Sequence, residues 1–337
     1  MANLETTYLG LTLKNPIIIG ACNLSLDLDM ARKLEDGGAA AIVFKSLFEE
    51  QINLESLEMQ EELDQYNERH AEMITQHPNL EHAGPEGHLD MLSQLKKHLS
   101  IPVIGSLNCV NRETWADYAL EMEKTGVDAL ELNFYSTMRN YDTPAQEIEA
   151  EQIQILEEIV AKVKLPISVK LSPFYSNTLH VIKQMDQVGV KGFVLFNRLF
   201  QPDIDLEKQE HTYPFNLSQI GDYRLPLRYA GLLFGQVKAN ICSNTGIFTG
   251  DDVIRMVLAG ADSVQVVSTV YRNKEEYLGK MLNDINHFMD QKGYGKLSDF
   301  KGDLSRIRLK DPYAYHRAQY VDLLMKPFEI MKRYPQV

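Results

Sequence analysis

The chain has 337 residues, a net charge of −13 and 44% hydrophobic residues. The acidic charge argues against a nucleic-acid partner, because neutralising phosphates requires clustered Lys and Arg. The three cysteines are odd in number and lie in apolar runs, which is typical of a reducing compartment. The first residues, M-A-N-L-E-T-T, resemble no signal peptide, and no apolar run reaches the length of a membrane span. We therefore expect a cytoplasmic protein that does not bind membranes.

Apolar runs and helical segments alternate along the chain. A small hairpin is expected at 8–14, around Gly10. The eight predicted strands are 16–21, 40–46, 102–108, 129–135, 166–173, 192–198, 239–245 and 262–269. The predicted helices are 27–37, 112–124, 144–163, 178–188, 227–238, 251–259 and 274–292. Because the strands are apolar on both faces, they predict a parallel sheet.

This alternation predicts an α/β fold, a (β/α)8 TIM barrel formed by one domain over 1–337. A doubly wound sheet is the alternative, which the absence of a G-x-G-x-x-G motif disfavours. Two excursions leave carboxyl ends of strands, where barrel enzymes place active sites and lids. They are an acidic, lid-like insertion at 48–87 and a segment at 200–226. A polar, aromatic extension at 293–337 is expected to pack over the barrel or a second subunit.

Polar residues stand at the carboxyl ends of most of the predicted strands. They are Lys45-Ser46, Asn108, Asn133, Lys170, Asn197-Arg198, Ser243-Asn244-Thr245-Gly246 and Ser268-Thr269. A core that needed only filling would not carry these groups, since each buried amide or ammonium requires a partner. Together they predict a polar mouth at one end of the barrel, suited to a flat ring rich in carbonyl groups.

Lys170 is the most informative of these residues. A carboxylate in the barrel interior is one explanation for a lysine near the end of a buried strand. The other is a flavin, because a cation beside its pyrimidine edge stabilises the anion that forms on reduction. Barrels often bind phosphate at the loops after strands seven and eight, where S-N-T-G-I-F-T-G-D-D precedes a helix that Thr249 could cap. FMN is therefore the predicted cofactor.

A series of motifs resembles the dihydroorotate dehydrogenase family over nearly the whole chain. The motifs are L-x-N-P-I-I-I at 13–19, K-S at 45–46, E-L-N at 131–133, V-K-L-S-P at 169–173, F-N-R at 196–198 and A-G-A-D-S-V-Q-V at 259–266. Other details resemble a branch labelled only dihydroorotate dehydrogenase-like. The resemblance implies an FMN-dependent barrel enzyme that oxidises the CH–CH group of dihydroorotate to give orotate, in pyrimidine biosynthesis.

The resemblance also implies residue roles. The cofactor residues would be Ala21, Lys45, Ser46, Asn108, Asn133, Lys170, Thr245, Gly246, Val267 and Ser268. The residues facing a small cyclic or carbonyl-bearing substrate would be Asn133, Asn197 and Arg198, and the catalytic residues would be Ser136 and Lys45. Where the family reads roughly N-L-S-C-P-N, this chain reads N-F-Y-S-T-M, which puts Ser136 at the position of the base. We expect a homodimer and an electron-acceptor protein as partners.

Several alternatives remain open from the sequence. Lys170 could be the Schiff-base nucleophile of an aldolase, although no carboxylate is expected at an adjacent strand end. The chain could also be the flavin-binding subunit of a redox complex with another substrate. Tyr135 or Tyr141 could replace Ser136, and Cys109 is expected to be a buried, inert thiol. The histidines at 70, 77, 82 and 88 are not spaced as metal ligands, so no metal is predicted.

Overall fold

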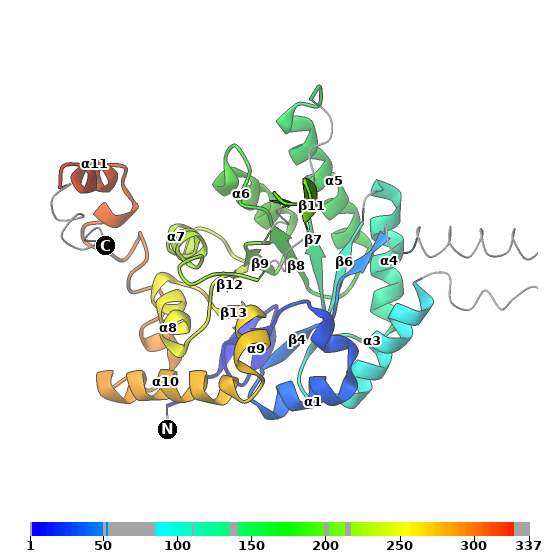
Figure 1. Cartoon of the computed structure of the whole chain (residues 1–337), viewed down its shortest axis with the longest axis horizontal. Coiled ribbons are helices and arrows are strands. Elements are labelled where there is room, and N and C mark those ends of the chain that lie inside the picture. The colour runs from blue at the N-terminus through cyan, green and yellow to red at the C-terminus, as the bar shows by residue number, and fades with distance from the viewer. Residues whose placement is uncertain are drawn as a thin grey trace, which may run out of the picture.

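The computed structural model describes residues 2–49, 52, 85–109, 111–134, 141–198, 202–212 and 217–326. Its centre is a parallel barrel surrounded by helices (Figure 1). The barrel strands are β3 (Ile17–Ile19), β4 (Ala41–Val43), β6 (Val103–Asn108), β7 (Ala129–Asn133), β8 (Ile167–Leu171), β9 (Gly192–Leu195), β12 (Asn240–Asn244) and β13 (Ser263–Val266). The pairing of β13 with β3 and of β4 with β6 closes the ring, and the short strand β5 (Leu47–Phe48) joins the edge of β6. The predicted TIM barrel is confirmed.

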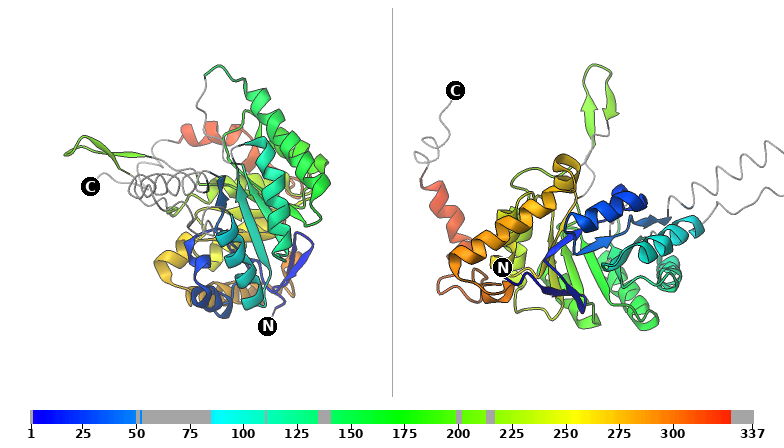
Figure 2. Two further views of the ribbon diagram at one scale, coloured as in Figure 1. Left: turned by 90° about the vertical axis from the view of Figure 1, so that its right-hand side faces the viewer. Right: turned by 90° about the horizontal axis from the view of Figure 1, so that it is seen from below.

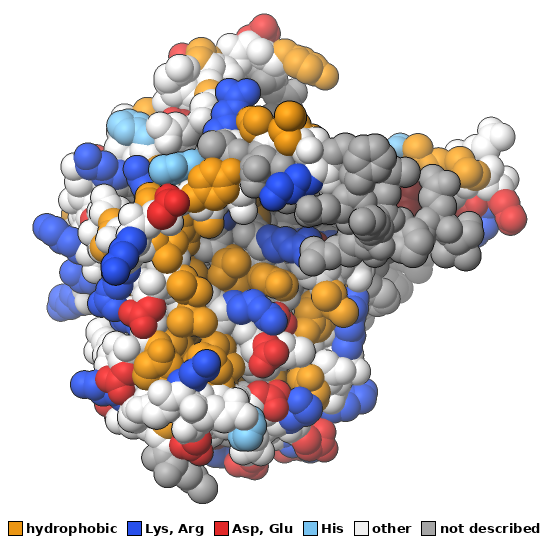
Figure 3. Space-filling model, turned by 90° about the vertical axis from the view of Figure 1, so that its left-hand side faces the viewer, with side chains coloured by type: hydrophobic (Ala, Val, Ile, Leu, Met, Phe, Trp, Pro, Cys, Tyr) orange, Lys and Arg blue, Asp and Glu red, His pale blue; other side chains and the backbone are white. Residues whose placement is uncertain are grey.

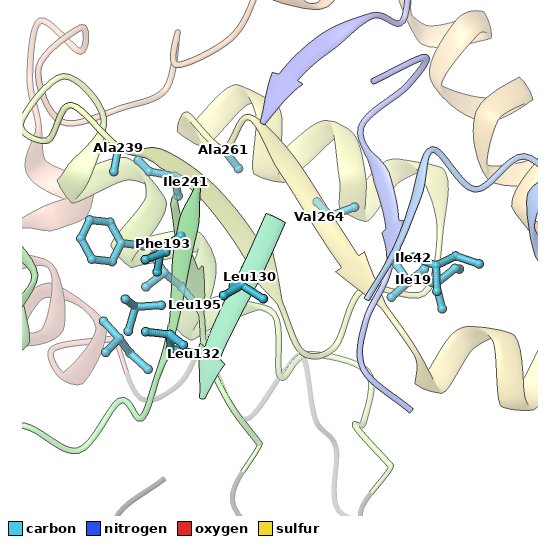
Figure 4. Packing of buried hydrophobic residues seen from close by; sticks show 14 of the residues in the cluster. Ile19, Ile42, Leu130, Leu132, Phe193, Leu195, Ala239, Ile241, Ala261 and Val264 are labelled. Atoms are coloured by element: carbon cyan, nitrogen blue, oxygen red, sulfur yellow. The ribbon is translucent and has the colours of Figure 1, made fainter. Parts of the chain in front are cut away.

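Side chains along each barrel strand alternate between the outer layer and the barrel interior. On β9, Phe193 and Leu195 belong to the outer core while Val194 belongs to the interior cluster. Figure 4 shows Phe193 and Leu195 beside Ile241 of the neighbouring strand. The same period puts Glu131 and Asn133 of β7 on the inward side. The alternation therefore decides which polar residues can reach the mouth.

Helices cover the outside of the barrel. They are α1 (Leu28–Asp36), α3 (Glu86–His98), α4 (Arg112–Lys124), α5 (Ala145–Lys162), α6 (Thr178–Val188), α7 (Arg224–Leu233), α8 (Gly250–Ala259), α9 (Ser268–Asn273) and α10 (Tyr277–Lys292), and a 3-10 turn η1 (Asn23–Leu26) precedes α1. The expected bounds of α4 and α6 are confirmed residue for residue.

Two expectations about the later helices are wrong. The helix expected at 227–238 is α7, which begins three residues earlier, because Pro226 fits in the first turn of a helix where its missing N–H costs nothing. The last strand expected at 262–269 ends at Val266, and Ser268 begins the separate helix α9. Lys274, with φ +69°, then separates α9 from α10.

The amino-terminal hairpin closes the bottom of the barrel. Its strands β1 (Thr6–Tyr8) and β2 (Leu11–Leu13) meet at the turn of Leu9 and Gly10, as predicted. Tyr8 and Leu9 are buried in the interior cluster. A Cβ atom at Gly192 would lie 2.8 Å from Leu9 Cδ2 and 3.0 Å from Tyr8 Cε2, so the absence of a side chain there makes room for the hairpin.

Carboxylates hold the same end of the barrel together. Asp128 accepts a hydrogen bond from Val103 N at 2.8 Å, and Asp262 accepts one from Ile241 N at 2.8 Å. Asp128 precedes β7 and thus bonds the start of β6, and Asp262 precedes β13 and thus bonds the start of β12. Asp262 also pairs with Lys301 at 2.6 Å. These contacts are structural, because they lie at the end of the barrel opposite the mouth.

The segments outside the barrel extend from it. The hairpin of β10 (Asp203–Asp205) and β11 (Glu210–Thr212) projects from the body (Figure 2). After α10 the chain forms the short turns η3 (Leu297–Asp299) and η4 (Tyr313–Tyr315), then helix α11 (Ala318–Leu324) at the side of α7 and α8 (Figure 1). Among the described helices, none is long and apolar enough to cross a membrane.

Candidate active site

A pocket opens at the carboxyl ends of strands β8, β9, β12 and β13. Its lining includes eight residues that the sequence analysis assigned to cofactor or substrate: Ala21, Lys170, Asn197, Arg198, Thr245, Gly246, Val267 and Ser268. The lining also includes Leu217, Ser218, Asn244, Ile247, Gln265 and Val266. Residues from six separate stretches of sequence therefore meet at one mouth, five of them at or just after the ends of parallel strands.

Lys170 contributes a nearly buried positive charge to this pocket. Its side chain lies on β8, and the residue is only 7% exposed. Its Nζ lies 3.6 Å from Oε1 of Glu131, a fully buried carboxylate on the adjacent strand β7, and 3.4 Å from Oε1 of Gln265. The carboxylate in the barrel interior, one of the two explanations for Lys170, is therefore present, although it lies two residues before the end of β7 and not at the strand end itself. Lys170 thus both faces a carboxylate in the barrel interior and lines the polar pocket at the mouth.

The loop after β12 presents bare backbone to the pocket. Thr245 and Gly246 both have positive φ, at +76° and +74°. A Cβ atom at Gly246 would lie 2.4 Å from Tyr223 N, so only glycine fits there. Thr249 caps α8 as predicted, in a capping box with Asp252. Asp252 also accepts from Phe248 N and Thr249 N, so these two N–H groups of the loop are already bonded.

Ser218 is a site residue that the sequence analysis missed. Its N and Oγ both donate to Ser268 Oγ at 2.9 Å, and its carbonyl oxygen accepts from Arg272 Nη2 at 3.1 Å. Ser218 belongs to the excursion at 200–226, which folds back over the loop after β13. The only sequence signal was the position of that excursion after a strand end, since the segment has no periodicity that could place one serine.

The other predicted cofactor residues lie beside the pocket, outside its described lining. Asn133 accepts a hydrogen bond from Asn197 Nδ2 at 2.9 Å, which orients both amides. Ser46 Oγ and Ser106 Oγ are 2.6 Å apart, and Asn108 is buried at the end of β6. The backbone N–H of Lys45 donates to Ser25 Oγ at 2.9 Å. These contacts fix the ends of β4, β6 and β7.

His88 is a second residue near the mouth that the sequence did not assign. Its ring meets Phe44 edge-on, with centroids 4.8 Å apart. Burial lowers the pKa of His88 to about 4, and the positive charge of Lys45 acts in the same direction. His88 is therefore neutral at pH 7 and adds no charge beside Lys45.

Arg198 forms an ion pair with Asp222, which also accepts from Gln219 N at 2.8 Å. Arg198 and Asn197 line both the pocket that contains Lys170 and a neighbouring pocket. The pair thus fixes the excursion at 200–226 to the end of β9, where the substrate residues were expected.

Several candidates are placed differently or lie outside the described residues. Ser136 and Tyr135 fall in the segment that is not described, as do three of the four histidines. Tyr141 is fully exposed, and Cys109 is buried as expected. Burial raises the pKa of the Cys22 thiol, so it is no thiolate at neutral pH. Among the described residues no group of His, Cys, Asp or Glu could hold a metal ion.

These observations fit FMN. Lys170 supplies a cation in a nearly buried position, which matches the anionic character of a reduced flavin ring. Gly246 presents backbone without a side chain, and Ser218 and Ser268 add hydroxyl groups to the lining. Backbone N–H groups and hydroxyls of this kind bind phosphate in other barrels.

Comparison with known proteins decides the family. The family model described as dihydroorotate dehydrogenase matches residues 3–289. The chain belongs to the dihydroorotate dehydrogenase family. The catalytic subunit of dihydroorotate dehydrogenase B (NAD(+)) from Thermoplasma volcanium is 26% identical over 307 residues, covering 90% of this chain and 98% of that protein. Dihydroorotate dehydrogenase A (fumarate) from Limosilactobacillus reuteri is 26% identical over 301 residues, covering 86% and 94%.

The family membership confirms the predicted class of enzyme and the predicted cofactor. The protein is an FMN-dependent oxidoreductase that acts on a CH–CH donor. It is not an aldolase, and Lys170 is better explained by a flavin and by Glu131 than by Schiff-base chemistry.

Proposed function

We propose that this enzyme oxidises dihydroorotate to orotate. The observation that carries the proposal is the pocket that joins Lys170 to the loops after β12 and β13, in a chain that matches the dihydroorotate dehydrogenase family model. The named activities of the relatives from Thermoplasma volcanium and Limosilactobacillus reuteri support the same substrate.

Bound FMN supplies a hydride acceptor for the carbon–carbon bond that is oxidised. The residues proposed to hold it are Ala21, Lys45, Ser46, Asn108, Asn133, Lys170, Thr245, Gly246, Val267 and Ser268, to which the structure adds Ser218. Lys170 would supply a positive charge to the ring that becomes anionic on reduction, and the backbone around Gly246 would bind the phosphate group.

The substrate residues are proposed to be Asn133, Asn197 and Arg198. The bond between the two asparagines orients their amide groups, which suits a ring with alternating C=O and N–H groups. Arg198 adds a positive charge for a carboxylate, although Asp222 shares it. Ser136 is proposed to remove the proton from one carbon as hydride leaves the next, and Lys45 is proposed to assist electrostatically.

The test uses the purified holoenzyme under anaerobic conditions. Dihydroorotate is expected to bleach the flavin absorbance and to yield one equivalent of orotate per flavin. Bleaching by dithionite with no bleaching by dihydroorotate would contradict the proposed substrate. It would favour the other sequence hypothesis, a flavin-binding subunit that serves a different substrate.

Ser136→Ala tests the base. It should keep FMN and its reduction by dithionite, while slowing flavin reduction by dihydroorotate at least about tenfold, because a positioned base contributes roughly 10²–10⁴-fold. Ser176→Ala, an exposed serine of the loop after β8, is the control and should reduce at the wild-type rate. Equal rates for both variants would remove Ser136 from the mechanism and direct attention to Tyr135 and Tyr141.

We also propose that the enzyme forms a homodimer through the segment Leu304–Lys326. This segment carries five Lys or Arg and two Asp in a chain of net charge −13, so the rest of a second copy offers the complementary acidic surface. Hydrophobic side chains run in a band between Lys and Arg side chains on this side of the molecule (Figure 3). In this segment Leu324 is 58% and Met325 is 75% exposed, and contiguous exposed apolar side chains of this kind mark interaction sites.

Sedimentation of the holoenzyme tests this dimer. Leu324→Glu with Met325→Glu should give a monomer, whereas Leu206→Glu on the β10–β11 hairpin should leave the dimer intact, because Leu206 is at least as exposed but lies elsewhere. A monomeric wild type, or a dimer that persists in the double variant, would contradict the proposal.

An electron-acceptor protein is also proposed, since one relative is named as a catalytic subunit. The three free cysteines support a cytoplasmic location.

A further inference from the structure

A buried carboxylate lies directly beneath the cofactor pocket. Glu131 is 0% exposed, and it points into the barrel from β7, two residues before Asn133 at the strand end. Its Oε2 accepts a hydrogen bond from Gln265 Nε2, and its Oε1 has no hydrogen-bond partner among the described residues. The nearest positive charge to that Oε1 is Lys170 Nζ, at 3.6 Å. A fully buried carboxylate requires such a partner.

Gln265 connects the two charges. While its Nε2 donates to Glu131, its Oε1 faces Lys170 Nζ at 3.4 Å. The three side chains come from β7, β8 and β13. Of these three residues, Lys170 and Gln265 line the pocket and Glu131 does not. Gln265 also lies close to the backbone just after β3, since a Cβ atom at Gly20 would lie 3.2 Å from its Oε1. The group is therefore held from several sides of the barrel.

We propose that Glu131 is a positioning residue that sets the reduction potential of the flavin through Lys170. Its negative charge offsets part of the positive field that Lys170 exerts on the cofactor, and the shared Gln265 keeps the ammonium group in place. A lone ammonium group in so buried a pocket would stabilise the reduced, anionic ring more strongly. The carboxylate thus keeps the cofactor harder to reduce than Lys170 alone would make it. The inference rests on the proposed role of Lys170 at the flavin.

The test measures the midpoint potential of bound FMN in three variants. Glu131→Gln keeps the shape and removes the charge, and it should favour the reduced flavin at least tenfold, a rise of about 30 mV for a two-electron couple. Glu131→Asp keeps the charge and should stay near the wild-type potential. Gln265→Glu adds a second carboxylate beside Lys170 and should shift the potential downward. Because this shift has the opposite sign, it tests the inference even if Glu131→Gln folds poorly.

The control is Glu35→Gln. Glu35 is also a buried carboxylate, but its bonds are to Ser100 N and Ile101 N at the opposite end of the barrel. Its loss should lower stability and leave the potential unchanged. Equal potentials for Glu131→Gln and wild type, or equal shifts for the Gln and Asp variants, would overturn the inference. Lys170→Met tests the role of Lys170 separately from that of Glu131. A wild-type potential in that variant would refute the placement of Lys170 at the flavin itself.

Discussion

Gly246 is the residue at which a single methyl group should separate backbone strain from loss of the cofactor. The substitution Gly246→Ala puts a side chain at φ +74°, in the left-handed region, which costs an L-residue about 1–2 kcal/mol. The new Cβ would also lie 2.4 Å from Tyr223 N and 2.8 Å from Asp222 C. Because both atoms are backbone, the 217–223 segment must move, and such overpacking typically costs a further ~1–3 kcal/mol. The expected loss is therefore roughly 2–5 kcal/mol.

Gly293→Ala is a matched control. Gly293 also has φ +74°, but no atom lies within 4 Å of its Cβ position, so it should show only the backbone cost of about 1–2 kcal/mol. Urea unfolding of the apoprotein measures both losses, and fluorescence titration measures FMN affinity. We expect Gly246→Ala to weaken FMN binding at least about tenfold, since it displaces Ser218, which is proposed to hold the cofactor, and Gly293→Ala to leave it unchanged. Equal losses of stability with equal FMN affinities would refute the packing argument.

Two further predictions concern stability. The pKa of His88 is about 4 in the folded protein against 6.5 for an unperturbed histidine, so the unfolded chain takes up the proton first. The stability from burying neutral His88 is complete above pH 6.5 and falls by about 3 kcal/mol as the pH drops to 4. Urea unfolding of His88→Phe should show a correspondingly flatter pH profile, and parallel profiles would contradict this assignment. Asp262→Ala should lose about 2–4 kcal/mol, because Ile241 N and Lys301 lose their partner. Exposed Asp251→Ala should change stability by less than about 1 kcal/mol, and similar losses for both would show that the Asp262 contacts contribute little.

The barrel itself could be predicted because its signals are local. Helices α4 and α6 have the expected bounds, since each combines an apolar stripe with recognisable ends, such as Asn177 before α6 and Gly189 after it. Helix α9 could not be separated from its strand in the same way. S-T-V-Y continues the β-branched run of β13, and only the turn at Val267 ends the strand. Propensity gives no warning of that turn.

The site could be predicted where a residue closes a strand, and not where tertiary packing brings a residue in. Lys170 and Gly246 follow from strand ends alone. The partnership of Lys170 with Glu131 had a signal, because the two-residue period turns both side chains inward on neighbouring strands. The residues at the strand ends do not include Glu131, because it lies two residues before the end of β7 and therefore deeper in the barrel. Ser218 had no such signal, because its position depends on how a long excursion folds back to Ser268.

The two ends of the barrel therefore use charged groups in different ways. At the bottom, Asp128 and Asp262 have their backbone and lysine partners within the chain, so these two carboxylates need no ligand. At the mouth, Lys170 is only partly matched, because Glu131 approaches it at 3.6 Å without a direct hydrogen bond. An incompletely satisfied cation in a nearly buried position is costly unless a ligand completes it. That difference explains why removing a bottom carboxylate should cost stability, whereas removing Glu131 should change the chemistry of the cofactor.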